Sequence, residues 1–184
     1  MVGVAYEEQL PVREARAGDP EAWDALLRRH QLPLFAYVQE LIRDEQASLD
    51  IVQETFIAAV RHVQRLERDD RFRSWLFSIA HQRCVQHWRK TACCLEPFDD
   101  HAEVLPDEGL ELDAWLLRHE QGQRVLECVD RLVPAQRSVL LLRYFEEFPL
   151  DEIAEITGVS VGTVKSRLHY AKRALRDRLK ESGV

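Results

Sequence analysis

The chain has 184 residues, enough for one or two small domains that each bury a core. Its 46% of hydrophobic residues and its mean hydropathy of −0.34 are typical of a soluble globular protein. No apolar run approaches the roughly 20 residues that a membrane span requires, so we expect no membrane insertion. The N-terminal stretch MVGVAYEEQLPVREA lacks a basic segment followed by an apolar one, and we therefore expect a cytoplasmic protein.

The net charge of −7 is distributed unevenly along the chain. Residues 61–90 hold eight basic and three acidic side chains, and residues 160–180 hold seven basic and one acidic. Residues 96–120 between them hold one basic and nine acidic side chains. Two basic blocks around an acidic one indicate two nucleic-acid contacts joined by a spacer that avoids phosphate.

The first half of the chain reads as a small helical domain. Hydrophobic spacing predicts helices over residues 8–17, 21–42, 48–63 and 73–90. Pro33 predicts a kink or a short break within the second helix, and Ser48 is expected to cap the third. The spacing predicts that one set of residues of the third helix faces the core: Ile51, Val52, Phe56, Ala59, Val60 and Val63. Four helices with short loops can share one core.

The helical pattern fails between residues 91 and 113, which contain two prolines and most of the acidic block. We interpret this segment as a linker. Helices are then expected over residues 114–132 and 135–145. The predicted fold is all-α, with one domain over residues 1–91, an acidic linker over 92–113 and a second domain over 114–184.

Residues 150–179 predict a helix-turn-helix. A short helix ends at Gly158, whose backbone can adopt the left-handed conformation, and Ser160 can cap the next helix. One face of that helix is apolar: Val161, Val164, Leu168, Ala171 and Leu175. The rest of its surface carries donors suited to phosphates and base edges: Thr163, Lys165, Ser166, Arg167, His169, Tyr170, Lys172 and Arg173. The alternative is a surface hairpin whose charges merely face water.

Three segments together resemble one protein family: LDIVQETFIAAV from Leu49, FRSWLFSIAHQRCVQHWRK from Phe72, and LLLRYFEEFPLDEIAEITGVSVGTVKSRLHYAKRAL from Leu140. The chain is similar to bacterial sigma factors of the extracytoplasmic-function (ECF) group. These are small sigma-70 family members with only the second and fourth conserved regions. The resemblance implies a factor that binds core RNA polymerase and promoter DNA, directs initiation, and is controlled by an anti-sigma factor.

The resemblance also implies roles for individual residues. The residues implied in docking on the clamp helices of the polymerase β′ subunit are Asp50, Gln53, Glu54 and Phe56. Alternatively, the polar ones belong to a solvated first helical turn, where acidic side chains favour the positive end of the helix. The family binds the −10 element and holds a flipped base in a loop pocket. The residues implied in this binding are Arg68, Arg71, Ser78, His81, Gln82, Arg83, Arg89 and Lys90. Trp75 and Ile79 are expected in the core. Reading of the −35 element falls to Thr163, Lys165, Ser166, Arg167, His169, Tyr170 and Arg173. Contact with the polymerase β flap falls to Val139, Leu140, Arg143 and Tyr144, unless these are ordinary core and surface residues.

The spacing of His81, Cys84 and His87 suggests a metal site, but a DNA-facing helix with a small buried cysteine explains it better. A redox role for Cys93 or Cys94 is equally speculative. We see no catalytic constellation, and we assign no catalytic residues, metal or cofactor. Two other functions stay open: a helix-turn-helix regulator with an all-α sensor domain, which would dimerise, and a metal sensor with a sigma-like fold.

Overall fold

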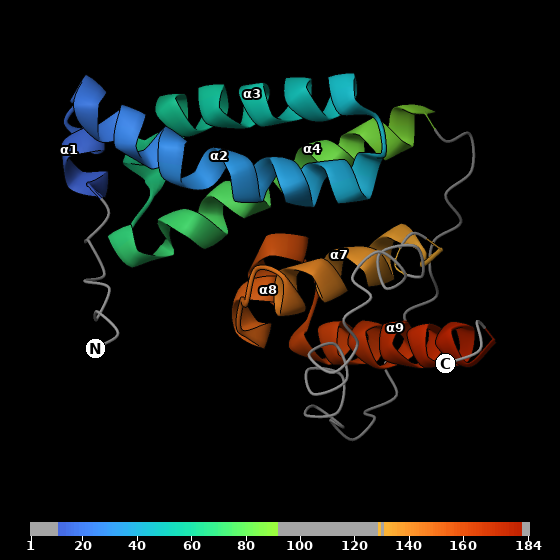
Figure 1. The fold of residues 1–184 in the computed structure, drawn as a ribbon. Coiled ribbons are helices and arrows are strands. Elements are labelled where there is room, and N and C mark those ends of the chain that lie inside the picture. The colour runs from blue at the N-terminus through green and yellow to red at the C-terminus, as the bar shows by residue number, and fades with distance from the viewer. Residues whose placement is uncertain (1–10, 92–128, 130, 182–184) are drawn as a thin grey trace, which may run out of the picture.

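The computed structural model describes residues 11–91, 129 and 131–181, and these ranges contain helices and turns but no strand (Figure 1). The predicted all-α fold is confirmed. The helices of the N-terminal group are α1 (Val12–Arg16), α2 (Pro20–Ile42), α3 (Glu45–His62) and α4 (Phe72–Thr91). Two 3₁₀ turns, η1 (Val63–Arg65) and η2 (Asp69–Arg71), connect α3 to α4. The C-terminal group consists of α7 (Pro134–Tyr144), α8 (Leu150–Thr157) and α9 (Val161–Glu181).

The predicted linker, and nearly all of the helix expected over residues 114–132, lie outside the described residues. In the part of the chain that is described, no helix is both long and apolar enough to cross a bilayer.

Two aspartates cap the N-terminal ends of α2 and α3. The Asp19 side chain accepts a hydrogen bond from the backbone N–H of Glu21 at 3.0 Å, and α2 then runs unbroken through Pro33. The predicted break at Pro33 is therefore absent, and the alternative, a kink there, stays a prediction. Asp44, not Ser48, caps α3, because its carboxylate accepts from the backbone N–H of Ala47 at 2.9 Å. The prediction for Ser48 was wrong, since the helix starts three residues earlier and buries that side chain.

The N-terminal group packs α2, α3 and α4 around one apolar core, with α1 against the start of α2 (Figure 1). Its fully buried members include Leu26, Leu34 and Val38 of α2, Ala59 of α3, and Phe72, Leu76 and Phe77 of α4. One prediction for α3 was wrong, because Val60 was expected inside but is 51% exposed. Thr55 is buried and donates its hydroxyl to the carbonyl of Ile51 at 2.7 Å.

The helix-turn-helix forms as the sequence predicts. Gly158 ends α8 with a φ of 70°, and the Ser160 hydroxyl accepts from the backbone N–H of Thr163 at 3.1 Å. The apolar face of α9 is buried at Val164, Leu168, Ala171 and Leu175. Val161 is the exception, 40% exposed at the first helical position.

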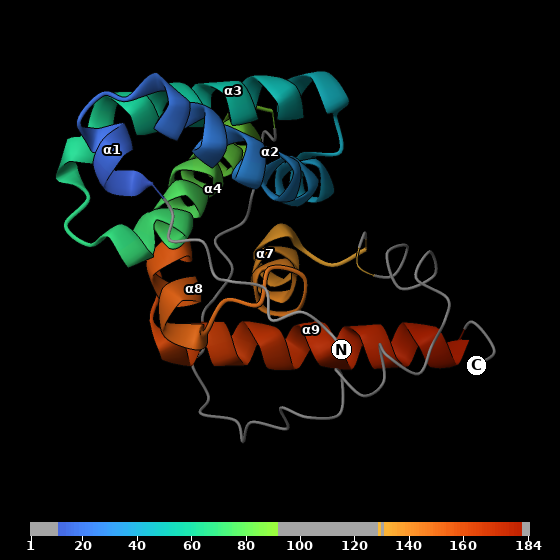
Figure 2. The ribbon, with the colours of Figure 1, turned by 60° about the vertical axis from the view of Figure 1, so that its left-hand side comes forward.

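The two groups of helices pack against each other, with α8 against α4 and α7 below α2 (Figure 2). Phe148, between α7 and α8, is 3% exposed, and its ring centroid lies 5.1 Å from that of Phe77 in α4. The Arg73 guanidinium lies 4.3 Å from the centroid of Phe148 and donates to the Glu146 carboxylate at 2.6 Å. Burial raises the pKa of Glu146, and the positive charge of Arg73 opposes that rise. The contact therefore combines an aromatic pair with a largely buried ion pair.

Arg137 makes a second connection between the groups. Its guanidinium is buried and donates to the carbonyl oxygens of Val129 at 3.2 Å and Leu132 at 3.0 Å, both just before α7. It also donates to the carbonyl oxygen of Glu40 in α2 at 3.1 Å. One side chain thus ties the entry to α7 to the end of α2. The sequence analysis did not single it out.

His81 lies inside the structure and not on a DNA-facing surface. It is 7% exposed, and its Nδ1 shares a hydrogen bond of 2.9 Å with the Tyr37 hydroxyl of α2. Burial, and to a smaller extent the positive charge of Arg167, lowers the pKa of His81 to about 4. The expectation that His81 reads a base is therefore incompatible with this packing, because the α2–α4 contact already uses the ring.

The buried His81 predicts a loss of stability on mild acidification. The unfolded chain takes up a proton near pH 6.5 and the folded chain only near pH 4, so acid favours unfolding across that window. At pH 5 this group alone should cost about 2 kcal/mol of unfolding free energy relative to pH 7. Urea unfolding at the two pH values measures it. His81→Gln, which does not titrate, should lose less stability than the native chain; an equal loss in both would contradict the assignment.

Candidate nucleic-acid interface

A cleft of about 410 Å³ lies between the loop of η1 and η2 and the first turns of α4. It contains three residues that the sequence analysis assigned to −10 binding, namely Arg68, Arg71 and Ser78. Its other lining residues are Arg65, Leu66, Glu67, Ser74 and Trp75, together with Glu155 of α8. The loop and the helix thus form one concave site rich in cations, with a carboxylate of the C-terminal group at its edge.

Trp75 is a wall of this cleft, and the sequence analysis had placed it in the core. Its ring is half-buried, with its centroid 5.9 Å from that of Phe72, and the residue also lines the cleft. Arg71, Trp75 and Ser78 are spaced by four and three residues and therefore share one side of the helical turn. That spacing was the signal available in the sequence. An aromatic ring beside cations is the arrangement on which unpaired bases stack.

Two arginines of the cleft, Arg68 and Arg71, are ion-paired. Arg68 makes a two-pronged contact with Asp70, at 2.6 and 3.1 Å. This contact raises the pKa of Arg68 and lowers the pKa of Asp70. The Arg71 guanidinium faces the acidic edge of α8, with N–O distances of 3.2 Å to Glu152, 3.7 Å to Glu155 and 3.8 Å to Asp151. Carboxylates therefore lie where phosphates of a bound strand would be expected.

The remaining −10 residues lie farther along α4. Gln82, Arg89 and Lys90 are exposed, as expected for residues that contact DNA. The Ser78 hydroxyl donates to the carbonyl of Trp75 at 2.7 Å, so it is occupied within its own helix. Arg83 forms an ion pair with Glu54 of α3. Because Glu54 was assigned to the polymerase contact, this pair joins the two predicted surfaces.

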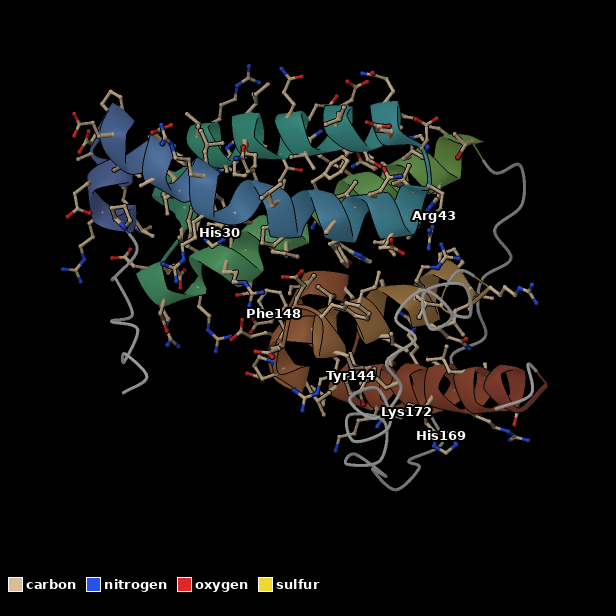
Figure 3. The ribbon with its side chains drawn as sticks, viewed as in Figure 1. His30, Arg43, Tyr144, Phe148, His169 and Lys172 are labelled. Carbon is tan, nitrogen blue, oxygen red and sulfur yellow. The ribbon has the colours of Figure 1, made fainter. Side chains whose placement is uncertain are left out.

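The predicted −35 residues divide into two lines along α9. Lys165 and Arg173 are exposed and His169 is half-buried between them; Figure 3 shows His169 on the side of α9 away from α7. The other line, at Thr163, Ser166, Arg167 and Tyr170, is less accessible. Thr163 and Ser166 are 8% exposed, and the Ser166 hydroxyl donates to the carbonyl of Gly162 at 3.2 Å.

The four residues of the second line differ in exposure, since Thr163 and Ser166 are buried and Arg167 and Tyr170 are half-buried. The charge of Arg167 helps to lower the pKa of His81 in α4. The ring centroid of Tyr170 lies 5.7 Å from that of His169. Lys172 is buried, with its ammonium 5.6 Å from the ring centroid of Tyr144 in α7 (Figure 3). Lys165 and Arg173 are thus available to DNA in this arrangement, and Thr163 and Ser166 are not.

The residues assigned to the β′ clamp helices lie on one side of α3. Asp50, Gln53 and Glu54 are exposed, and Phe56 is buried. Beside them is an apolar cleft of about 400 Å³, which the sequence analysis missed. The cleft is lined by Leu27, Gln53, Phe56, Ile57, Val60 and Arg61. Ile57 is 44% exposed and Val60 51% exposed. The surface is therefore an apolar groove with a polar rim, which is the usual composition of a protein-binding site.

The residues assigned to the β flap have mixed positions. Val139 and Leu140 are buried in the core, which agrees with their alternative interpretation. The Arg143 guanidinium donates to the carbonyl of Phe148 at 3.2 Å, and Tyr144 lies under Lys172. Neither polar group projects freely as a contact residue would.

The helical position of Cys84 is unsuited to metal binding. Cys84 is fully buried, and burial raises the pKa of its thiol to about 12, which disfavours the thiolate that metals bind. Among the residues that the structure describes, no group of three or more His, Cys, Asp or Glu side chains is placed to hold a metal ion. Cys93 and Cys94 lie outside the described residues.

Comparison with known proteins gives matches in both halves of the chain. The sigma-70 region 2 family matches residues 26–92, and the sigma-70 region 4 family matches residues 122–175. The ECF RNA polymerase sigma factor SigL of Mycobacterium tuberculosis (strain H37Rv) is 31% identical over 180 residues, covering 94% of this chain and 97% of SigL. The sigma factor SigW of Bacillus subtilis (strain 168) is 25% identical over 179 residues, covering 92% and 95%.

Solved structures agree on the fold. CnrH, solved in complex with the cytosolic domain of CnrY, superposes with a TM-score of 0.68 at 24% identity, covering 95% of this chain and 97% of that one. The sigma factor RpoE of Bartonella quintana, solved with the anti-sigma factor NepR, superposes with a TM-score of 0.66 at 21% identity, covering 87% and 98%. With the two region matches in order and a relative above 30% identity along nearly its whole length, the chain belongs to the ECF sigma factors of the sigma-70 family.

Proposed function

We propose that this sigma factor reads a promoter at two places through the residues described above, while bound to core RNA polymerase. The cleft beside Trp75 would take a flipped base of the −10 element, with Arg68 and Arg71 on the flanking backbone. Extruding a base costs a few kcal/mol, which stacking and ionic contacts can offset. The observation that carries the proposal is the convergence of an aromatic wall and cations in one cleft at the start of α4.

The −35 element would be read by α9 in the major groove. The exposed line of Lys165, His169 and Arg173 offers donors one turn apart, which suits base edges and phosphates. Arg167 and Tyr170 of the inner line would add contacts from the same helix, whereas Thr163 and Ser166 are buried here and would contribute only if α9 became more exposed. Arg89, Lys90 and Gln82 would continue the DNA contact along α4. No catalytic role is proposed, because the polymerase carries out RNA synthesis.

Docking on the polymerase would use the apolar groove of α3. Ile57 and Val60 supply exposed apolar surface, and Gln53 and Glu54 supply the polar rim. Burial of such a groove favours association, whereas its rim fixes orientation. The polymerase β flap would meet the surface near α7. We place the factor in the cytoplasm, where its polymerase works.

Control by an anti-sigma factor is part of the proposal. RpoE was solved with the anti-sigma factor NepR, and CnrH with the cytosolic domain of CnrY. The packing of α8 on α4 supports a related idea. DNA at the cleft and the α8 carboxylates would compete for Arg71, so the two groups of helices must separate before the −10 strand binds.

Selection from randomised DNA tests the promoter function. Holoenzyme assembled from purified core polymerase should enrich two sequence blocks at a fixed spacing and start transcription downstream. Lys165→Ala with Arg173→Ala should weaken use of the upstream block roughly tenfold, since two DNA contacts are lost. Run-off transcription measures this change, with Arg28→Ala, an exposed arginine of α2, as control. A single palindromic site bound without polymerase would instead favour the regulator alternative.

The docking surface is tested by pull-down with core polymerase. Gln53→Ala with Glu54→Ala should weaken association about tenfold, because the rim loses an amide and a charge beside the groove. The matched control removes the exposed ion pair of Asp24 and Arg28 on α2. If both double variants bind core polymerase like the native chain, α3 is not the docking surface.

The acidic edge of α8 can be neutralised without changing the arginines of the cleft. Asp151→Asn, Glu152→Gln and Glu155→Gln together should raise the affinity of the chain for single-stranded −10 DNA several-fold, because Arg71 loses its competing partners. Fluorescence anisotropy measures the affinity. The control neutralises three exposed acids of α2 and α3, at Glu21, Asp24 and Glu45, for the same change in net charge. An equal gain in affinity in both triple variants would mean that net charge alone causes the gain.

A further inference from the structure

The short helix α1 is attached to the loop that forms the −10 cleft. The Nη2 group of Arg16 donates to the carbonyl oxygen of Leu66 at 2.7 Å and to the Asp69 carboxylate at 2.8 Å. Arg13 donates to the other oxygen of the same carboxylate, also at 2.8 Å. In return, the Gln64 side chain donates to the carbonyl of Arg16 at 2.6 Å. Four hydrogen bonds therefore join α1 to residues 64–69.

The loop has few contacts of its own to fix its shape. Leu66 is its one buried apolar side chain among residues 64–71, and η2 has no side-chain cap. The Arg16 guanidinium bridges the loop between Leu66 and Asp69, on either side of Glu67 and Arg68. Hydrogen bonds to charged groups of this kind hold a segment more firmly than neutral ones. Without Arg16 the two halves of the loop would lose their common partner.

The attachment point is itself rigid. Val12 and Ala15 of α1 are buried against the N-terminal core, at 0% and 2% exposure. The Trp23 indole N–H of α2 donates to the carbonyl of Ala15 at 2.9 Å, one residue before Arg16. The ring of Trp23 in turn lies 6.3 Å from Phe72, the first residue of α4. Arg16 is therefore held in a fixed relation to both walls of the cleft.

Charge gives α1 a second effect on the site. The Asp69 carboxylate lies in the loop beside Arg68 and Arg71 and would repel a DNA backbone. Arg13 and Arg16 both pair with it, and Asp69 and Arg16 are each 28% exposed. The pairing neutralises an acid next to the site without placing either arginine among the cleft residues.

We infer that α1 is a positioning element of the −10 site: Arg16 holds the loop in the shape that admits an unpaired base, and with Arg13 it neutralises Asp69. The ligand is single-stranded DNA. The inference rests on the proposed function of the cleft, but it assigns a role to a helix that contacts no DNA itself. Arg16 acts through the loop and is not a contact residue.

Holoenzyme binding to a labelled single-stranded −10 oligonucleotide, taken from the selected promoters, tests the inference. Arg16→Gln should weaken binding roughly tenfold, as expected for a lost charged hydrogen bond that orders the site. Core polymerase binding should stay native, because α3 is untouched. The slope of affinity against salt should also stay native, since losing a phosphate contact would reduce that slope by about one. Arg28→Gln is the matched control.

Two further variants keep the test decisive. Asp69→Asn removes a connection and the repelling charge together, so it should weaken oligonucleotide binding less than Arg16→Gln does, and the double variant should be no weaker than Arg16→Gln alone. Arg16→Lys keeps the charge but lacks the planar fork, so it should recover only part of the affinity. Native affinity in Arg16→Gln, a double variant weaker than Arg16→Gln, a reduced salt slope, or a parallel loss of core binding would overturn the inference.

Trp75→Ala separates failure of this inference from failure of the proposed cleft. If Trp75→Ala weakens oligonucleotide binding while Arg16→Gln does not, the assignment of the cleft as the −10 site holds and the positioning role of α1 is wrong. If neither variant changes binding, the cleft is not the −10 site and both proposals fall. Weakening in both variants, with native core binding, supports both.

Discussion

The burial of α4 against two sets of helices is the constraint on which the rest of the structure depends. Within the N-terminal group, Leu76 and Ala80 are fully buried, and Phe77 lies 5.4 Å from Tyr37 of α2 between ring centroids. The same Phe77 ring meets Phe148 from the C-terminal group. A helix used in this way keeps little free surface. What is left for DNA is a strip through Ser78 and Gln82 and the basic end at Arg89 and Lys90, together with the cleft at its start.

Features that rest on local signals could be predicted from the sequence. The cap at Ser160, the left-handed Gly158 and the spacing of Val164, Leu168 and Ala171 each depend on residues within a turn or two, and together they fix the helix-turn-helix. The outward positions of Asp50, Gln53 and Glu54 followed from the same periodicity. Family resemblance then placed the basic loop beside the start of α4, where the structure has a cleft.

Features that depend on packing between distant segments could not be predicted. His81 and Ser78 are three residues apart on one helix, and only the arrival of Tyr37 from α2 decides that the first is buried. Val60 fits the apolar spacing of α3 but lines the open groove beside Leu27 of α2, so it stays exposed. Arg137 gives no sequence signal, because backbone carbonyls of Val129, Leu132 and Glu40 accept its hydrogen bonds and carbonyls are present at every position. Contact between the two groups was unexpected for domains read as separate modules.

The ion pairs of the basic stretch have a consequence for the chain away from polymerase. Arg68, Arg71, Arg73 and Arg83 all face carboxylates, and the whole chain is acidic. Non-specific attraction to DNA comes from release of the counterions condensed on it, and this release scales with the number of cations offered to the phosphates. A chain with neutralised arginines releases few. We therefore expect these four arginines to add little to the binding of chromosomal DNA, which leaves the protein available for capture by the transcription machinery.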